Sequence, residues 1–163
     1  MRRPGLRAPR PHRRQGEHGM SYVHSERVRF GDLDANRHLN NVVFLRYFET
    51  ARIAYLRELV PGHDPSNPQT DEYGVIFAEC HINYRSPVRF DEQVDVGCSI
   101  GTVRRSSFRV QFEMRVDGRL VAEGYGVLVG FDYTSDSARQ LPQELHDRLL
   151  QESGEGEQAA AGA

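Results

Sequence analysis

Residues 29–41 read Arg29-Phe30-Gly31-Asp32-Leu33-Asp34-Ala35-Asn36-Arg37-His38-Leu39-Asn40-Asn41, and the rest of the chain is organised around this stretch. Two carboxylates, one histidine and three carboxamides fall within residues 32–41. A helix cap and Asx-turns would explain one or two of these side chains, because asparagine is a favourable N-cap and aspartate accepts turn hydrogen bonds. Six together, between a strand and an apolar helix, indicate a reactive site.

The segment after this stretch predicts one long helix over residues 42–60. Its apolar stripe, at helical spacing, consists of Phe44, Phe48, Ala51, Tyr55 and Leu59. Further apolar residues broaden the stripe until nearly every side of the helix is apolar, so other elements must enclose it. Glu49 and Arg52 lie beside the stripe, three residues apart, and this spacing predicts a partly buried ion pair. The alternative interpretation gives Glu49 a catalytic role.

Alternating residues predict a strand over 22–30, ahead of the stretch, with Tyr22, Val28 and Phe30 on one face. After the helix, a proline-containing loop leads into four more strand patterns, at 73–86, 93–103, 107–117 and 120–131. One face of the first of these four carries Ile76, Ala78, Cys80, Ile82 and Tyr84.

Asp117-Gly118 predicts a type I′ hairpin turn between the last two strands. A short helix follows at 144–150, with Pro142 at its first position. This order predicts an α+β domain in which one antiparallel sheet encloses one apolar helix. Such a sheet leaves edges uncovered, which favours a homodimer or a higher even assembly.

Length and charge restrict the class of protein. At 163 residues the chain fits one domain, and we expect a disordered basic extension at 1–19, a folded domain at 20–151 and a disordered tail at 152–163. No signal peptide or membrane span is evident, so a cytoplasmic location is expected. All 21 cationic residues are arginine, and six of them fall in residues 1–19. The remainder carries a net charge of −7, which argues against nucleic-acid binding by the folded part.

No pattern of metal ligands is present in the sequence. Asp32, Asp34 and Asn36 resemble the start of a calcium loop, but the glycine and glutamate that such a loop needs further on are replaced by Arg37 and Val43. The two cysteines, Cys80 and Cys98, lie inside strand patterns, where they are expected to be small buried apolar residues. We therefore expect neither a metal nor a disulfide.

One ordered set of residues resembles the strand–loop–helix signature of hotdog-fold thioesterases of the 4-hydroxybenzoyl-CoA thioesterase type. It consists of the run Arg-Phe-Gly-Asp-Leu-Asp, followed by His38, Asn40-Asn41, Phe44 and Tyr47. The run from Asp34 to Asn41 is also similar to the active-site segment of plant acyl-ACP thioesterases. The resemblance covers about residues 23–150. It departs from many bacterial members at Arg37, where those proteins have glycine. It implies a hotdog fold, a thioesterase activity and a homodimer or homotetramer with sites at the subunit interface.

Thioester hydrolysis needs an activated water or a nucleophile, and it needs a donor for the oxyanion. Asp34 is the candidate general base or nucleophile. Backbone N–H groups at the helix start, around Asn40 and Asn41, are candidate oxyanion donors. The resemblance to the plant enzymes implies that His38 and Asn36 orient Asp34 or the water.

The substrate would be an acyl-CoA or acyl-ACP, with coenzyme A as part of the substrate and no separate cofactor. Its phosphates need cations, for which Arg85, Arg104 and Arg105 are candidates. Two other functions stay open. A hotdog-fold acyl-CoA hydratase or dehydratase would use an aspartate–histidine pair, although the spacing from Asp34 to His38 is one residue shorter than the motif expected for it. A non-catalytic acyl-CoA-binding protein would dispense with the Asp34 carboxylate.

Overall fold

The computed structural model describes residues 19–67 and 72–154. The elements follow one another as β1 (Tyr22–Arg27), the short 3₁₀ helix η1 (Phe30–Asp32), α1 (Asn41–Leu59), β2 (Val75–Tyr84), β3 (Gln93–Val103), β4 (Ser107–Val116), β5 (Arg119–Asp132), β6 (Ser137–Ala138) and α2 (Gln143–Ser153).

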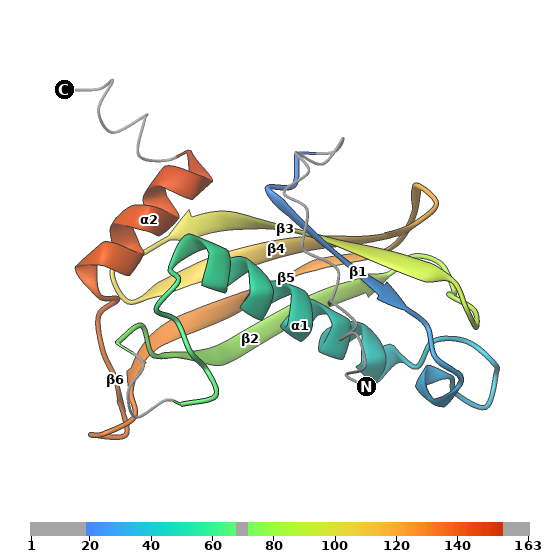
Figure 1. Cartoon of the computed structure of the whole chain (residues 1–163), viewed down its shortest axis with the longest axis horizontal. Helices are drawn as coiled ribbons and strands as arrows, with labels where there is room; N and C mark the ends of the chain where they lie inside the picture. Colours follow the sequence, from blue (N-terminus) through green and yellow to red (C-terminus); the bar gives the residue numbers. More distant parts are fainter. Residues whose placement is uncertain (1–18, 68–71, 155–163) are drawn as a thin grey trace, which may run out of the picture.

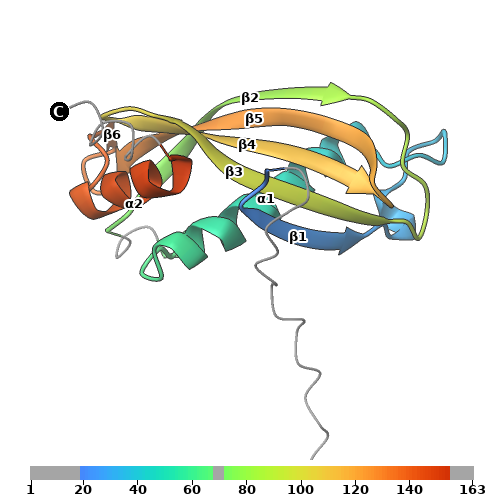
Figure 2. The same cartoon turned by 90° about the horizontal axis from the view of Figure 1, so that it is seen from above.

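One curved antiparallel sheet forms the body of the protein. Its strands lie in the order β1-β3-β4-β5-β2, and the two-residue strand β6 pairs with the end of β5. The long helix α1 crosses one face of this sheet, and the shorter α2 lies at the end where β3 turns into β4 (Figures 1 and 2). The α+β hotdog architecture expected from the sequence is confirmed.

Helix α1 is held by its apolar stripe, all five residues of which are buried. At its centre the Phe48 ring packs 4.3 Å from the Phe112 ring of β4, measured between centroids. Burying a side chain of this size stabilises the fold by roughly 1.5–3 kcal/mol. The helix begins at Asn41, one residue before the expected start, because the Asn40 side chain accepts a hydrogen bond from the Val42 N–H and caps it.

The β4–β5 hairpin follows the sequence prediction. Asp117 and Gly118 have φ angles of 49° and 81°, the two positive values that a type I′ turn requires.

Neither helix in the described ranges has the length and apolar character needed to cross a membrane.

The face predictions for two strands were partly wrong. Strand β1 ends at Arg27, and the chain then turns into η1, so Phe30 leaves the face of Tyr22 and Val28 and is 80% exposed. In β2 the pairing with β5 shifts register between Phe77 and Glu79. A bulge of this kind moves the preceding residues to the opposite face. The Phe77 ring consequently faces Phe48 of α1, with 6.3 Å between ring centroids.

Helix α2 is longer than expected and includes residues assigned to the tail. It ends at Ser153, where Gly154 adopts a left-handed conformation with φ 75°. Glu152 was expected to be disordered, but its carboxylate accepts a 2.8 Å hydrogen bond from the Tyr55 hydroxyl of α1. Pro142 is the N-cap rather than the first helical residue. Residues 1–18 of the extension predicted at 1–19, and residues 155–163 of the tail predicted at 152–163, lie outside the described residues.

Candidate active site

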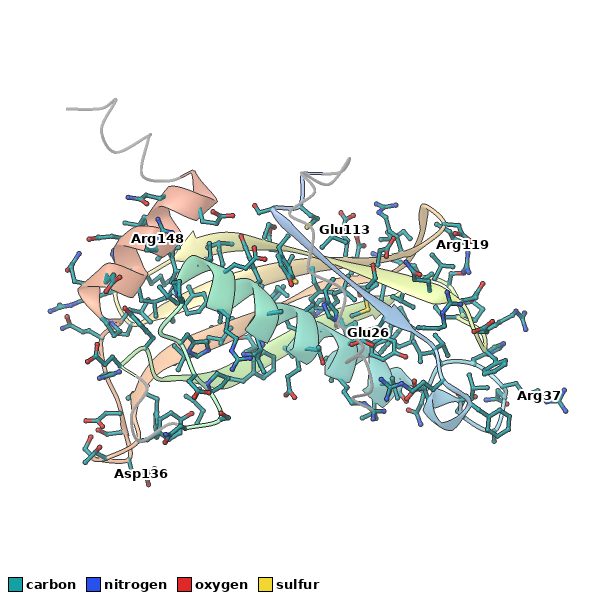
Figure 3. All side chains as sticks on the ribbon, in the orientation of Figure 1. Glu26, Arg37, Glu113, Arg119, Asp136 and Arg148 are labelled. Carbon is teal, nitrogen blue, oxygen red and sulfur yellow. The ribbon has the colours of Figure 1, made fainter. Side chains whose placement is uncertain are left out.

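The polar stretch forms a tight loop between η1 and α1. A bridge pairs Leu33 with Leu39, and inside it the Asp34 N–H donates to the His38 carbonyl at 2.8 Å. Arg37 donates its N–H to the Asp34 carbonyl and has φ 61°, a left-handed conformation that is uncommon outside glycine. At this position many bacterial members of the family that the sequence resembles have glycine, and here the loop closes with arginine instead. Figure 3 shows the Arg37 side chain extending away from the body of the protein.

The Asp34 carboxylate is held by the loop backbone on one oxygen only. Its Oδ1 accepts hydrogen bonds from the N–H groups of Asn36, at 2.8 Å, and His38, at 3.2 Å. No described residue donates to Oδ2, and the side chain is partly exposed. One oxygen is therefore fixed in position while the other remains open to a water or a substrate.

Asp32, two residues earlier, has an entirely different environment. It is 7% exposed, and its Oδ2 accepts hydrogen bonds from the Arg29 N–H at 3.0 Å and the Tyr47 hydroxyl at 2.9 Å. Arg46 forms an ion pair with Oδ1 at 3.4 Å. Burial alone would raise the pKa of Asp32, but these hydrogen bonds and the Arg46 charge outweigh it, so the pKa lies below its ordinary value. Asp32 braces the turn.

The N-terminus of α1 leaves one backbone donor unused. The Val42 N–H donates to the Asn40 side chain, and the Val43 N–H donates to the Asn40 carbonyl. The N–H of Asn41 has no partner within the described ranges. It lies at the positive end of the helix dipole, where a negative charge is stabilised.

Of the remaining residues of the predicted catalytic set, two contact Asp34 and one lies away from the loop. Asn36 and His38 contact Asp34 through their backbone N–H groups, and the His38 side chain is half-buried. Glu49 lies eight residues into α1, about 12 Å along the helix axis from Asn41, and is exposed. The structure therefore does not bring Glu49 to the loop.

The expected ion pair between Glu49 and Arg52 is absent from the described part of the chain. Arg52 is only 9% exposed, and its Nε is buried without a hydrogen-bond partner. Its guanidinium instead lies 4.9 Å from the centre of the Phe77 ring. Glu49, three residues earlier, is exposed, and its charge only partly offsets the burial that lowers the pKa of Arg52.

The three candidate phosphate-binding arginines are not brought together. Arg85 follows β2 at the Asp34 end of the sheet and is paired with Glu123 at 2.6 Å. Arg104 and Arg105 lie beyond the far end of β3, an 11-residue strand that spans roughly 35 Å when extended. Arg104 lines a surface hollow of about 220 Å³ there together with Arg109 and other residues.

Two residues that complete this region, Arg46 and Tyr47, were given no role from the sequence, although Tyr47 belongs to the quoted signature. Both reach Asp32 from the second turn of α1. A buried tyrosine hydroxyl usually has a hydrogen-bond partner, so a tyrosine in an apolar helix was the feature of the sequence that could have indicated this contact.

Within the described ranges, no three histidine, cysteine or acidic residues are grouped so that they could hold a metal ion. Cys80 and Cys98 are free thiols.

Comparison with known proteins supplies a family for this geometry. A family model described as the thioesterase-like superfamily matches residues 28–149. The structure is similar to a thioesterase of Thermus thermophilus, solved in complex with coenzyme A and Zn, with a TM-score of 0.73 and 31% sequence identity. This alignment covers 84% of the present chain and 97% of the Thermus chain.

Two further solved structures share the fold at lower identity. A thioesterase-superfamily protein from Jannaschia sp. CCS1 has a TM-score of 0.73 and 23% identity, over 84% of this chain and 86% of its own. A 1,4-dihydroxy-2-naphthoyl-CoA thioesterase from Synechocystis has a TM-score of 0.70 and 15% identity, over 78% of this chain and 94% of its own.

Proposed function

Since this chain belongs to the thioesterase-like superfamily and is a thioesterase, we propose that it hydrolyses acyl-CoA or acyl-ACP thioesters to a free acid and a thiol. The observation that carries the proposal is the Asp34 carboxylate, with one oxygen fixed by two backbone N–H groups and the other oxygen open. A carboxylate held in this way is suited to act on a carbonyl group or on a water beside it.

Asp34 acts by one of two routes. As a general base it takes a proton from a water while the water oxygen attacks the thioester carbonyl carbon. As a nucleophile it attacks that carbon itself and forms an acyl anhydride, which a water then hydrolyses. In both routes the carbon–sulfur bond breaks, and the thiol leaves with a proton. The carbonyl oxygen becomes negative in the intermediate, and the free N–H of Asn41 at the α1 terminus is its donor.

Support for a coenzyme A thioester comes from relatives. The Thermus thioesterase was solved with coenzyme A, and the Synechocystis enzyme is named for a CoA thioester. An acyl-carrier-protein thioester carries the same reactive group, so the carbonyl chemistry at Asp34 does not separate the two. We propose no separate cofactor and no metal for the reaction, because neither the sequence pattern nor the described side chains offer a set of ligands.

The working form is proposed to be a homodimer or homotetramer in the cytoplasm. Strand β2 is a ten-residue sheet edge with exposed apolar side chains, and an unprotected edge of this kind favours pairing with another chain. His38 and Asn36 are proposed to position Asp34, mainly through their backbone N–H groups.

The decisive experiment incubates the full chain with a panel of acyl-CoAs and a thiol reagent. Release of free coenzyme A that persists in the presence of a chelator is expected. A loss of activity with chelator that a divalent ion restores would refute metal-free hydrolysis. Water addition to an unsaturated acyl-CoA without thiol release would identify a hydratase instead. Tight binding with no turnover of any substrate would indicate a non-catalytic acyl-CoA-binding protein.

A further inference from the structure

One of the groups proposed for the reaction, the Asn41 N–H, depends on the position of the backbone alone. Asn41 is the first residue of α1 and is exposed. The N–H groups of a first helical turn have no partners inside the helix, and helix ends fray. A catalytic donor, in contrast, has to stay within about 0.5 Å of its productive position. The proposed chemistry therefore requires contacts that keep the first turn of α1 in place.

Tyr84, the last residue of β2, makes such a contact. Its hydroxyl donates a 3.0 Å hydrogen bond to the carbonyl oxygen of Asn41. Its ring meets the Phe44 ring edge-on, with 5.2 Å between the centroids and 77° between the planes. Phe44 lies one turn into α1 and is buried in the core. The Tyr84 side chain consequently holds the start of the helix both by its backbone and by packing.

The other contacts near Asn41 act from a different direction. The Leu39 N–H donates to the Val88 carbonyl at 2.7 Å, which fixes the loop before the helix. The N-cap bond of Asn40 joins residues of one turn, so it favours the helical conformation without tying the helix to the sheet. The Tyr84 bond lies on the helix side of Asn41. The donor is therefore held from both directions only when this bond is present.

The position of Tyr84 is itself set by the sheet. Tyr84 lies opposite Ala122 in the antiparallel pairing of β2 with β5, and it is 43 positions from Asn41 in the sequence. Partial burial raises the pKa of its hydroxyl above the ordinary tyrosine value, so the group stays protonated and remains a donor at neutral pH. The contact thus transfers the fixed position of a paired strand to the first residue of the helix.

Stability alone gives little reason for a hydroxyl at this position. Tyr84 is 47% exposed, and water can replace a hydrogen bond made at an exposed site. Phenylalanine would keep the ring and its contact with Phe44. What the hydroxyl adds is the bond to the residue that carries the oxyanion donor.

We propose that Tyr84 is a positioning residue for the reaction, which holds the Asn41 N–H where the oxyanion forms. This inference rests on the proposed function and adds to it a residue of β2, outside the loop and helix that carry the other groups. Tyr84 acts through the backbone and does not touch the thioester. Its hydroxyl should therefore affect the transition state, in which the oxygen is negative, more than the binding of the uncharged substrate.

The first test is steady-state kinetics of Tyr84→Phe in the full chain, with an acyl-CoA that the wild type hydrolyses. The value of kcat should fall about tenfold, which is less than the 10²–10³ expected for complete loss of an oxyanion donor. KM should stay within about twofold of the wild type. A contact that served substrate binding would instead raise KM.

Tyr133→Phe is the matched control. The Tyr133 hydroxyl donates to the carbonyl oxygen of Val75, the first residue of β2, also at 3.0 Å. This variant loses the same kind of bond, of the same length, at the other end of the same strand. It should keep the kcat of the wild type. The urea midpoint of Tyr84→Phe should be lowered no more than that of the control.

A second test needs no turnover. Hydrogen exchange followed by mass spectrometry should be faster in the first turn of α1 in Tyr84→Phe than in the wild type. Exchange in the rest of α1 should be unchanged, and Tyr133→Phe should show no difference in the first turn. Equal exchange in the first turn of Tyr84→Phe and wild type would overturn the proposal.

The outcomes distinguish this inference from the proposed function. A wild type that hydrolyses no acyl thioester would overturn both. An active wild type with equal kcat in Tyr84→Phe and Tyr133→Phe, or with a change in KM alone, would overturn the role of Tyr84 and leave the thioesterase standing. A urea midpoint of Tyr84→Phe far below that of the control would make the contact structural and would also overturn that role.

Discussion

The Tyr47 hydroxyl lies 2.9 Å from Oδ2 of Asp32 and connects the second turn of α1 to the turn that precedes the candidate active site. Both residues are buried, and they are 15 positions apart in the sequence. Hydrogen bonds to a buried carboxylate belong to the stronger class, because the acceptor is charged. This contact fixes the direction in which the chain leaves η1 and so positions the Asp34 loop on the helix.

Tyr47→Phe should lower the free energy of unfolding by about 1–3 kcal/mol near neutral pH, because it removes one donor from a buried carboxylate. The pKa of Asp32 is lower in the folded state than in the unfolded chain, so its ionised form stabilises the fold above about pH 4. That contribution is lost as the pH falls through the lowered pKa. Urea unfolding from pH 2 to pH 7 should show the difference between variant and wild type narrowing in acid.

Tyr22→Phe is the matched control for this measurement. The Tyr22 hydroxyl is also buried but has no hydrogen-bond partner among the described residues. Its removal should leave stability unchanged or slightly higher, with no dependence on pH over the same range. A Tyr47→Phe curve parallel to that of the wild type from pH 2 to pH 7 would contradict the role given to the Asp32 contact.

Asp34→Asn should reduce turnover of an acyl-CoA by about 10² or more, because it keeps the shape of the side chain and removes its basicity. Substrate affinity should change little. Asp32→Asn, the internal control, should retain more turnover and lose more stability. His38→Ala should stay closest to the wild type in turnover, because it keeps the backbone N–H through which His38 contacts Asp34. Steady-state kinetics on the four proteins check this order. Turnover that survives Asp34→Asn and collapses with Glu49→Gln would assign the reaction to the helix carboxylate instead.

Gly124→Ala should destabilise the protein by roughly 2 kcal/mol or more, because an added methyl group would overlap the His81 carbonyl oxygen of β2. Relief of this overlap requires β2 and β5 to separate at the residues that pair them. Gly31→Ala should stay within about 0.5 kcal/mol of the wild type, since no neighbouring atom lies within 4 Å of the added carbon. Thermal and urea unfolding of both variants measure the contrast.

Cys98 should resist alkylation until the protein unfolds. It is fully buried, and burial raises the pKa of its thiol to about 12, so almost no thiolate exists at pH 8. Cys80 is only partly buried, and burial also raises the pKa of its thiol, so its reaction should be slow but detectable. Mass spectrometry after iodoacetamide treatment, with and without denaturant, distinguishes the two sites. Rapid labelling of Cys98 in the native protein would contradict its place in the core.

The sequence by itself determined the elements and their order. The α1 stripe, the four strands after it and the Asp117-Gly118 turn arise from local periodicity and local backbone preference, which neighbouring residues express without the rest of the fold. The residues of the candidate site could also be proposed from the sequence, because Asp34, Asn36, His38 and Asn41 all belong to one short loop and the helix start. Residues that are close in sequence stay close in space.

Only the tertiary structure decided which side chains meet across elements. A bulge in β2 turned Phe77 toward α1, and the 3₁₀ turn moved Phe30 into solvent, although simple alternation placed both otherwise. Arg52 lost its expected partner because packing against Phe77 held it inside, while Glu49 stayed in water. Arg104 and Arg105 came to lie a full strand length from Asp34. Each of these outcomes depends on register and packing between distant segments, and a local pattern does not contain that information.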